Sequence, residues 1–227
     1  MNFIHSGATG DMIFSLPVIK DMGGGDLYIT NFHKQRSESI KKLIEVQPYI
    51  SNVIITDEHI EGVNLNKFRE YAGHHNNLVE AHYKGQGLIS SEWWKNGWLQ
   101  LPEKKPILQG VKYAVVNRTT NYADPNFDWS KEIDYLKSFN DEIFFVGYYE
   151  EYKLFKETFN ISINYYDADF LTAAYLMQNA QMVSCCYSCM ATIAQGLGIR
   201  YRIEQAPGHT CSSFFIERET IINAEAH

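Results

Sequence analysis

Short extended runs alternate with helical patterns along the first quarter of the chain. NFIH at residues 2–5 is too short for a helix and ends at a glycine loop, whereas MIFSLPVIKDM at 12–22 carries apolar residues at helical spacing. The extended runs DLYITNF at 26–32 and NVIIT at 52–56 flank SESIKKLIEVQ at 37–47, which has a helical pattern. Three alternations of strand with helix predict a parallel α/β sheet.

The alternation stops in the middle of the chain and resumes in its second half. Residues 57–100 follow no regular pattern, and LPEKKP at 101–106 is typical of a linker because two prolines bracket charged residues. Beyond it the pattern predicts strands at 113–118, 142–147 and 181–186 and helices at 131–139, 150–159, 168–180 and 189–198. The sequence therefore predicts two α/β domains, residues 1–104 and residues 105–227.

Composition narrows the class of protein. Apolar residues make up 45% of the 227 residues and aromatic residues 14%, as in globular proteins and unlike disordered ones. No apolar run approaches the roughly 20 residues of a membrane helix, and no signal-peptide pattern begins the chain, so we expect a cytoplasmic protein. The net charge of −7 gives no general attraction to nucleic acid, which favours a small ligand.

The first candidate site is the loop SGATGD at residues 6–11. Gly7 and Gly10 allow a close approach of backbone or ligand, and the amides of the following helix start favour an anion. Asp11 would repel a phosphate, which suggests that its carboxylate faces a hydroxyl or a cation, as a general base would. The alternative is that Asp11 is the N-cap residue of the helix. The loop matches neither the Walker motif nor GxGxxG.

The second candidate site is SCCYSCMATIAQGLG at residues 184–198. Here a predicted strand leads into a helix whose first turn offers Ser188 and backbone amides, an arrangement that suits a phosphate. Ser188 is also a good N-cap, and the two roles are compatible. In NRTTN at 117–121, Arg118 directly follows a strand and its planar guanidinium suits a phosphate, although an exposed arginine is the common alternative.

The cysteines allow a third interpretation. Cys185, Cys186 and Cys189 lie within five positions, unlike the dispersed cysteines of a secreted disulfide protein, so we expect reduced thiols. Cys186 and Cys189 form a CxxC pair at a helix start, which is typical of redox sites, and with His209 and Cys211 they would complete a zinc set. Buried, unreactive cysteines are the alternative.

Together these loops resemble a known family. SGATGDMIFSLPVIKDM is similar to the N-terminal signature of the heptosyltransferase-like family 9 glycosyltransferases, in which a strand leads into a small-residue loop, Gly-Asp, apolar residues and Leu-Pro. YAVVNRTTNYADPNFDW, EIFFVG and LMQNAQMVSCCYSCMATIAQGLGIRYRIEQAP follow in the order of that family's nucleotide-sugar domain. The resemblance leaves only residues 57–100 unmatched. It implies the GT-B arrangement, two Rossmann-like parallel-sheet domains facing a cleft, with the donor mainly on the C-terminal one.

The resemblance also implies an activity. Asp11 would be the base toward an acceptor hydroxyl in an inverting, metal-independent transfer from a nucleotide-sugar, with no further cofactor. The acceptor would be a glycan, a protein or a modified nucleobase. Ser188 and the helix start after it match the place where that family holds the donor diphosphate. The donor-binding residues that we expect are Gly10, Arg118, Thr119, Ser188, Cys189 and Met190.

Three departures from the family pattern keep other functions open. The usual Asp-Thr-Gly reads Tyr187-Ser188-Cys189, the histidine that often follows is Thr192, and the lysine before Trp129 is Asp128. Arg118 would have to supply the missing positive charge. A noncatalytic nucleotide or nucleotide-sugar binding protein is therefore the second hypothesis, and a zinc or redox protein built on Cys186 and Cys189 is the third.

Overall fold

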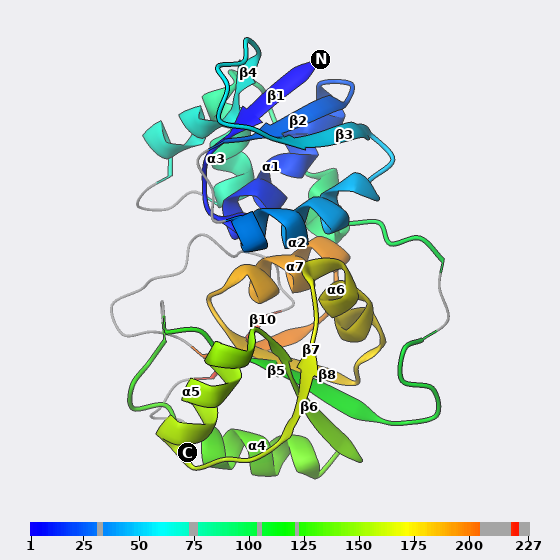
Figure 1. Ribbon diagram of the computed structural model, residues 1–227, viewed down its shortest axis with the longest axis vertical. Helices are drawn as coiled ribbons and strands as arrows, with labels where there is room; N and C mark the ends of the chain where they lie inside the picture. The colour runs from blue at the N-terminus through cyan, green and yellow to red at the C-terminus, as the bar shows by residue number, and fades with distance from the viewer. Residues whose placement is uncertain (31–33, 73–76, 104–105, 121–122, 205–218, 223–227) are drawn as a thin grey trace. The chain divides into compact units, whose positions relative to one another are not determined.

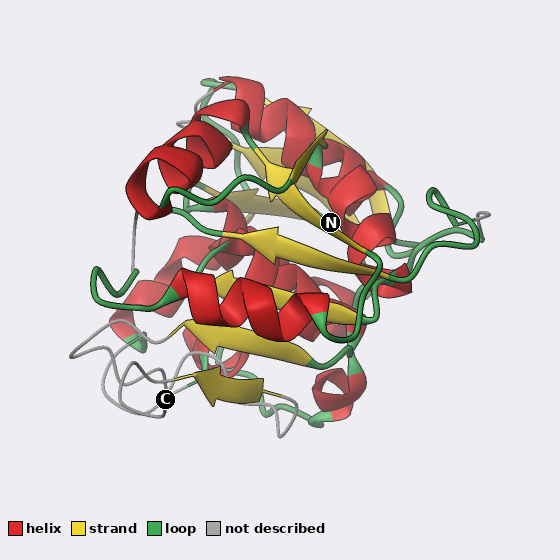
Figure 2. Cartoon of the chain, turned by 90° about the horizontal axis from the view of Figure 1, so that it is seen from below, coloured by secondary structure: helices red, strands yellow, loops and turns green. Residues whose placement is uncertain are grey.

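The chain forms two compact units (Figure 1). The computed structural model describes residues 1–30, 34–72, 77–103, 106–120, 123–204 and 219–222. The N-terminal unit holds Met1–Pro102 together with Gly196–Gly198, and the C-terminal unit begins at Glu103. Figure 2 shows the strands of each unit side by side, with helices packed against them.

The N-terminal unit is built on a parallel sheet in the order β3-β2-β1-β4. Its strands are β1 (Asn2–His5), β2 (Gly25–Ile29), β3 (Ile50–Ile55) and β4 (Val63–Asn64). Its helices are α1 (Thr9–Asp21), α2 (Lys34–Glu45), α3 (Leu78–Gly85) and the short 3₁₀ helices η1 (Leu65–Glu70) and η2 (Trp93–Asn96). The previously unassigned stretch 57–100 thus contains β4, η1, α3 and η2.

The strand order decides which face of this sheet forms the core. Connections between parallel strands are right-handed, so a steady advance from β1 to β2 to β3 places α1 and α2 on the same face. Helix α3 packs against α1 on that face as well (Figure 1). The side chains of Phe3, His5, Leu27, Ile29 and Val53 point to this side and are buried. Strand β4 then lies on the other side of β1, which makes the β1–β4 boundary the point where the order reverses.

The C-terminal unit contains a larger parallel sheet in the order β10-β9-β8-β5-β6-β7. Its strands are β5 (Tyr113–Asn117), β6 (Glu142–Gly147), β7 (Asn164–Asp167), β8 (Met182–Cys186), β9 (Tyr201–Glu204) and β10 (Glu219–Ile222). Its helices are α4 (Trp129–Lys137), α5 (Tyr149–Phe159), α6 (Phe170–Asn179) and α7 (Cys189–Leu197). The order reverses between β5 and β8.

A cluster of aromatic and aliphatic side chains joins this sheet to α4 and α5. Trp129 at the start of α4 is fully buried and packs its ring edge-on against Phe127 and Phe155, with centroids 5.2 Å away in both cases. Burial of such large rings contributes most of the apolar area that stabilises a core of this size. The cluster also fixes the loop after β5, because Phe127 and Trp129 close that loop onto the sheet.

Most of the elements expected from the sequence are confirmed. Strand β6 has the predicted bounds, and α1 begins three residues before the predicted helix while keeping Pro17 inside. On α2, the predicted apolar side is confirmed by the burial of Ile40, Leu43 and Ile44. Strands β4, β7, β9 and β10 were not predicted. The fold class, α/β with parallel sheets, is confirmed in both units.

Candidate functional site

Each candidate loop lies where the strand order of its sheet reverses. Ser6, Gly7 and Ala8 leave the carboxyl end of β1 beside β4, while Arg118 and Thr119 leave β5 beside β8. In open α/β sheets this reversal opens a crevice outside the carboxyl ends of the strands, and ligands bind there. Gly10 and Asp11 therefore lie beside the reversal point of the N-terminal sheet. The other predicted donor-binding residues lie beside the reversal point of the C-terminal sheet.

Asp11 is held at the start of α1 by a backbone amide. The N-cap residue is Ala8, and Asp11 stands three positions later, where its Oδ2 accepts the Ala8 N–H at 3.2 Å. The interpretation of Asp11 as the N-cap residue is therefore wrong in position, although its carboxylate does satisfy a free amide at this helix end. Asp11 is half-buried, so the bond fixes the carboxylate while leaving part of it accessible.

Two opposing effects set the protonation of Asp11. Burial raises the pKa of its carboxyl group, which makes the carboxylate a better proton acceptor. The Ala8 N–H and the positive charge of Arg69 act in the other direction and lower that pKa. Arg69 lies on η1, in the stretch that the sequence left unassigned, and it is exposed. It adds a cation to this site that the sequence reading missed.

The remaining amides of the loop are also bound by side chains. Ser6 N–H donates to Oδ1 of Asn66 at 2.9 Å, and Gly7 N–H donates to Nδ1 of His5 at 2.8 Å. Asn66 Oδ1 also accepts the Ser6 hydroxyl at 3.0 Å and Nη1 of Arg69 at 2.9 Å. The N–H groups of Ser6, Gly7 and Ala8 thus donate to side chains of the protein. An anion at this site would therefore be bound by the first turn of α1 and by Arg69.

On the C-terminal unit, Ser188 caps helix α7. Its Oγ accepts the Met190 N–H at 3.2 Å and donates to Oδ1 of Asn117 at 3.1 Å. Asn117 is buried at the end of β5, where its Nδ2 donates to the Val146 carbonyl at 2.9 Å. The predicted cap is confirmed, and the bond to Asn117 joins the ends of β5 and α7 at the reversal point.

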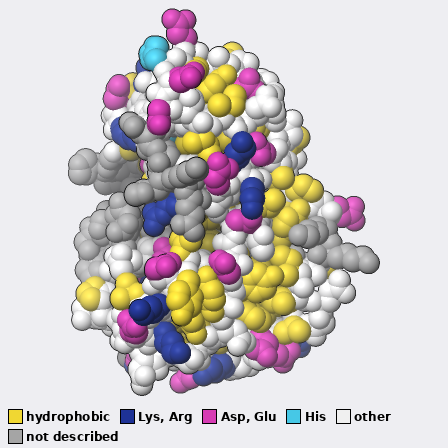
Figure 3. All heavy atoms as spheres, in the orientation of Figure 1, with side chains coloured by type: hydrophobic (Ala, Val, Ile, Leu, Met, Phe, Trp, Pro, Cys, Tyr) yellow, Lys and Arg dark blue, Asp and Glu magenta, His cyan; other side chains and the backbone are white. Residues whose placement is uncertain are grey.

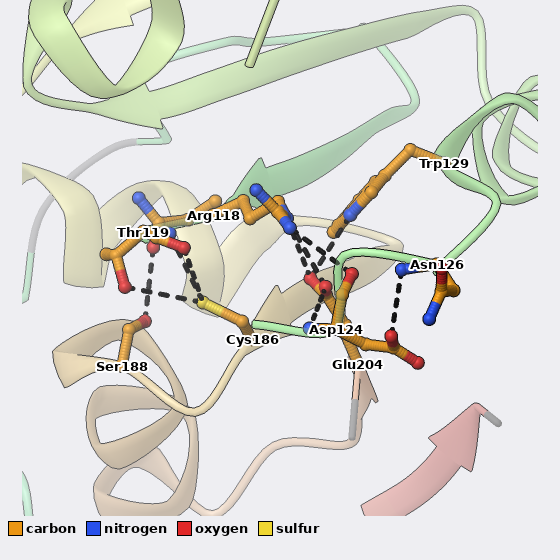
Figure 4. A network of polar contacts seen from close by, with 9 residues as sticks. Arg118, Thr119, Asp124, Asn126, Trp129, Cys186, Ser188 and Glu204 are labelled. Carbon is orange, nitrogen blue, oxygen red and sulfur yellow. Dashed lines mark hydrogen bonds and ion pairs between the residues drawn. The ribbon is translucent and has the colours of Figure 1, made fainter. Parts of the chain in front are cut away.

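Arg118 binds a buried carboxylate. Its Nε lies 3.1 Å from Oε2 of Glu204, whose side chain is fully buried at the end of β9. Glu204 also accepts the Asp124 N–H at 2.7 Å and the indole N–H of Trp129 at 3.1 Å (Figure 4). Burial raises the pKa of Glu204, and Arg118 and these donors lower it. The structure therefore gives Arg118 a protein partner, and its predicted contact with a phosphate stays a prediction.

Thr119 and Cys186 contact each other at the carboxyl ends of β5 and β8. The Thr119 N–H donates to Sγ of Cys186 at 3.2 Å, and the two side chains lie 3.6 Å apart at Oγ1 and Sγ (Figure 4). Burial raises the pKa of the Cys186 thiol, which disfavours the thiolate that redox chemistry needs. Cys185 is buried as well, and neither it, Cys186 nor Cys189 is in a disulfide.

The predicted zinc set reaches outside the described residues, because His209 and Cys211 lie there. Within the described part of the chain, no three His, Cys, Asp or Glu side chains are grouped as a metal site would require. The two remaining residues predicted to bind the nucleotide-sugar donor are Cys189 and Met190, which lie in the first turn of α7. The Met190 side chain is buried, so only its backbone faces the site.

Gly147 is the last residue of β6 and lies among the carboxyl ends of the strands of this sheet. A Cβ atom at Gly147 would lie 2.7 Å from Nδ2 of Asn117 and 3.1 Å from Oε2 of Glu151, and its φ is +150°. Only glycine fits there, because a side chain at this buried position would collide with Asn117 and Glu151. The sequence reading missed Asn117, Gly147 and Glu204. For Asn117 and Gly147 the available signal was a place at the end of a predicted strand, whereas Glu204 ends β9, which was not predicted.

Charged side chains of both signs are intermingled on the face drawn in Figure 3. The net charge of −7 is therefore not concentrated in one patch on that face. Along the stretches that the structure describes, no helix is long and apolar enough to cross a membrane.

No protein-family model and no curated protein sequence matches this chain. Solved structures match it in fold. A glycosyl transferase of family 9 from Veillonella parvula superposes with a TM-score of 0.74 at 10% identity, covering 98% of this chain and 85% of that one. The E. coli heptosyltransferase WaaC with ADP-2-deoxy-2-fluoro heptose gives 0.66 at 12% identity, covering 97% and 92%. The E. coli ADP-heptose lps heptosyltransferase II gives 0.64 at 9% identity, covering 97% and 89%. At these identities the likeness shows the fold, and it confirms the two Rossmann-like parallel-sheet units expected from the resemblance.

Proposed function

We propose that this protein is a glycosyltransferase that moves a sugar from a nucleotide-sugar donor to an acceptor hydroxyl with inversion and without a metal ion. One observation carries the proposal: on a fold of GT-B type, the Asp11 carboxylate is fixed by the Ala8 N–H at the reversal point of the N-terminal sheet. A half-buried carboxylate with a raised pKa is a suitable general base.

In the proposed reaction, Asp11 takes the proton of the acceptor hydroxyl. The acceptor oxygen forms a bond to the anomeric carbon while the bond from that carbon to the donor phosphate breaks. The electron pair of the broken bond leaves with the nucleoside diphosphate, and attack opposite the leaving group inverts the configuration. Asp11 is protonated at the end of the step and returns its proton to water.

The C-terminal unit would hold the donor. The N-terminus of α7, which follows Ser188, carries the positive end of the helix dipole and suits the developing charge of the diphosphate. Since WaaC has been solved with an ADP-linked sugar analogue, ADP-sugars are the first donors to test.

The test has two stages. A thermal-shift screen against nucleoside diphosphates and nucleotide-sugars identifies the donor, because a ligand of the folded state raises the melting temperature. With that donor, Asp11→Asn is expected to lower kcat by a factor of about 10²–10⁴ while donor Kd stays unchanged. Asp134→Asn, which changes an exposed carboxylate on α4, is the matched control. Transfer by Asp11→Asn at the wild-type rate would remove Asp11 from the role of base.

A noncatalytic nucleotide-binding protein remains the second candidate. It is favoured by the engagement of Arg118 with Glu204, because this bond withdraws a cation from the leaving diphosphate. This candidate predicts a thermal shift with a nucleotide-sugar and no release of nucleoside diphosphate, in wild type and Asp11→Asn alike.

A further inference from the structure

His5 immediately precedes the loop that leads to Asp11. It is the last residue of β1, it is fully buried, and its Nδ1 accepts the Gly7 N–H at 2.8 Å. An imidazole nitrogen accepts a hydrogen bond only when it carries no proton, so this contact requires the neutral ring with its proton on Nε2. Burial lowers the pKa of His5 to about 3, which keeps the ring in that form.

His5 and Asp11 flank the same glycine. A Cβ atom on Gly7 would lie 2.5 Å from Cε1 of His5 and 3.0 Å from Oδ2 of Asp11. Gly7 thus separates the two side chains, and the next amide, that of Ala8, holds the Asp11 carboxylate. Any shift of the Gly7 peptide moves the Ala8 N–H and, with it, the carboxylate oxygen.

Two further rings fix the His5 side chain. His82 of α3 lies 5.6 Å from His5 between ring centroids, and Phe68 of η1 lies 5.9 Å away in a stacked arrangement. Phe68 and His82 stack on each other at 4.2 Å. Nε2 of His5 and both ring nitrogens of His82 are buried with no hydrogen-bond partner among the described residues. Unpaired buried polar atoms destabilise a fold, and they tend to persist where a function requires them.

We propose that His5 is a positioning residue for Asp11: its Nδ1 fixes the Gly7 peptide, and thereby the Ala8 amide that holds the carboxylate in place. The proposal rests on the proposed function, in which Asp11 is the base. It explains why a buried imidazole stands at this strand end, where an apolar side chain would pack without leaving Nε2 unpaired.

Asparagine and glutamine at position 5 form a matched pair of test variants. The asparagine side chain places an acceptor near the position of Nδ1 and can accept an N–H two residues ahead, as in an Asx turn. The longer glutamine side chain moves its amide toward the position of Nε2. Both variants are uncharged amides, so they differ mainly in whether the Gly7 N–H keeps its acceptor.

We expect His5→Asn to retain kcat within about threefold and His5→Gln to lose about 10²-fold, with donor Kd unchanged in both, because a misplacement of about 1 Å costs that much. An NMR titration of the Asp11 carboxyl carbon supplies a readout that needs no turnover. The pKa of Asp11 should be higher in His5→Gln than in His5→Asn, since loss of the Ala8 N–H removes a contact that lowers it.

The outcomes separate the two proposals. If Asp11→Asn abolishes transfer but the two His5 variants have equal kcat and equal Asp11 pKa, His5 is only a core residue and its positioning role is overturned. If Asp11→Asn transfers normally, the assignment of the base fails and the role of His5 fails with it. If neither His5 variant folds, hydrogen exchange of the Gly7 N–H in the wild-type protein provides the test. Exchange as fast as that of an exposed loop amide would overturn the proposal, and strong protection from exchange would support it.

Discussion

The Nε of Arg118 lies 3.1 Å from a carboxylate oxygen of Glu204, and the Glu204 side chain is fully buried. A buried carboxylate is unfavourable unless it is paired and hydrogen-bonded. Arg118, Asp124 and Trp129 together supply the donors that Glu204 needs. The pair therefore ties the loop after β5 to the end of β9, and it gives Arg118 a structural role that does not depend on any ligand.

Replacing Arg118 should destabilise the fold. Arg118→Met leaves Glu204 as a buried charge without its cation, so the free energy of unfolding should fall by about 3–5 kcal/mol in urea denaturation. Arg118→Met with Glu204→Gln removes both charges, keeps an amide oxygen that can accept one of the Asp124 and Trp129 N–H groups, and should recover part of that loss. Arg200→Met, at an exposed position, is the control.

The double variant also tests donor binding by Arg118. If the folded double variant binds the nucleoside diphosphate as tightly as wild type, Arg118 serves only the ion pair. A Kd raised about tenfold or more would support a second contact with the diphosphate. A loss of less than about 1 kcal/mol on Arg118→Met alone would contradict the structural role.

Arg69 should set the lower end of the pH range in which the protein is active. Its charge lowers the pKa of Asp11, so Arg69→Gln should raise that pKa. Because Asp11 must be unprotonated to act as a base, the acid limb of kcat/KM should move to higher pH, with the plateau at higher pH retained within about twofold. Lys67→Gln, which removes an exposed charge from the same 3₁₀ helix, is the matched control. A limb that stays in place in Arg69→Gln would contradict the assignment of Asp11 as the group that titrates.

The buried histidines should make the fold sensitive to acid. Burial lowers the pKa of His5 to about 3 and lowers that of His82 well below its usual value. Below about pH 6.5 the unfolded chain binds protons that the folded chain excludes, so this stability is complete above pH 6.5 and is lost as the pH falls. Between pH 7.5 and 5.5, each imidazole should reduce the free energy of unfolding by about 1 kcal/mol.

His82→Phe isolates one of these contributions. The phenyl ring keeps the stacking on Phe68 and removes the titrating group, so the drop in unfolding free energy between the two pH values should be smaller by about 1 kcal/mol. His59→Phe, which replaces an exposed histidine, is the matched control. Parallel pH profiles for His82→Phe and wild type would show that His82 is protonated as easily in the folded chain as in the unfolded one.

The sequence revealed those parts of the fold that have a regular pattern. EIFFVG is apolar over almost its whole length and gave β6 with its observed bounds, because a strand buried on both faces appears as a continuous apolar run. Strand β4 has two residues, and the four residues of β7 read NYYD, so neither is long enough to show a period. Such strands form because neighbouring strands are already in place.

The residues of the candidate site were likewise predictable from the sequence only where the signal was local. Asp11 and Ser188 were found because each stands at a helix start, which is a local signal. The partners of these loops come from far along the chain: Asn66 binds Ser6 across 60 residues, and Glu204 binds Arg118 across 86. Those pairings follow from the strand order of each sheet, which no local pattern specifies.

The two roles of Ser188 can be separated by two substitutions. Both Ser188→Ala and Ser188→Gly lose the bond to Asn117, but Ser188→Ala should lower the free energy of unfolding by about 1 kcal/mol more than Ser188→Gly, because glycine is tolerated as an N-cap. Neither variant retains the hydroxyl. If that hydroxyl also binds the donor diphosphate, the Kd for nucleoside diphosphate should rise by about threefold to tenfold in both variants alike. Urea denaturation should therefore find Ser188→Gly more stable than Ser188→Ala, because only the cap distinguishes them. Titration calorimetry should find the same Kd for both variants, because both lack the hydroxyl. An affinity that is unchanged in Ser188→Gly would show that Ser188 only caps the helix and orients Asn117.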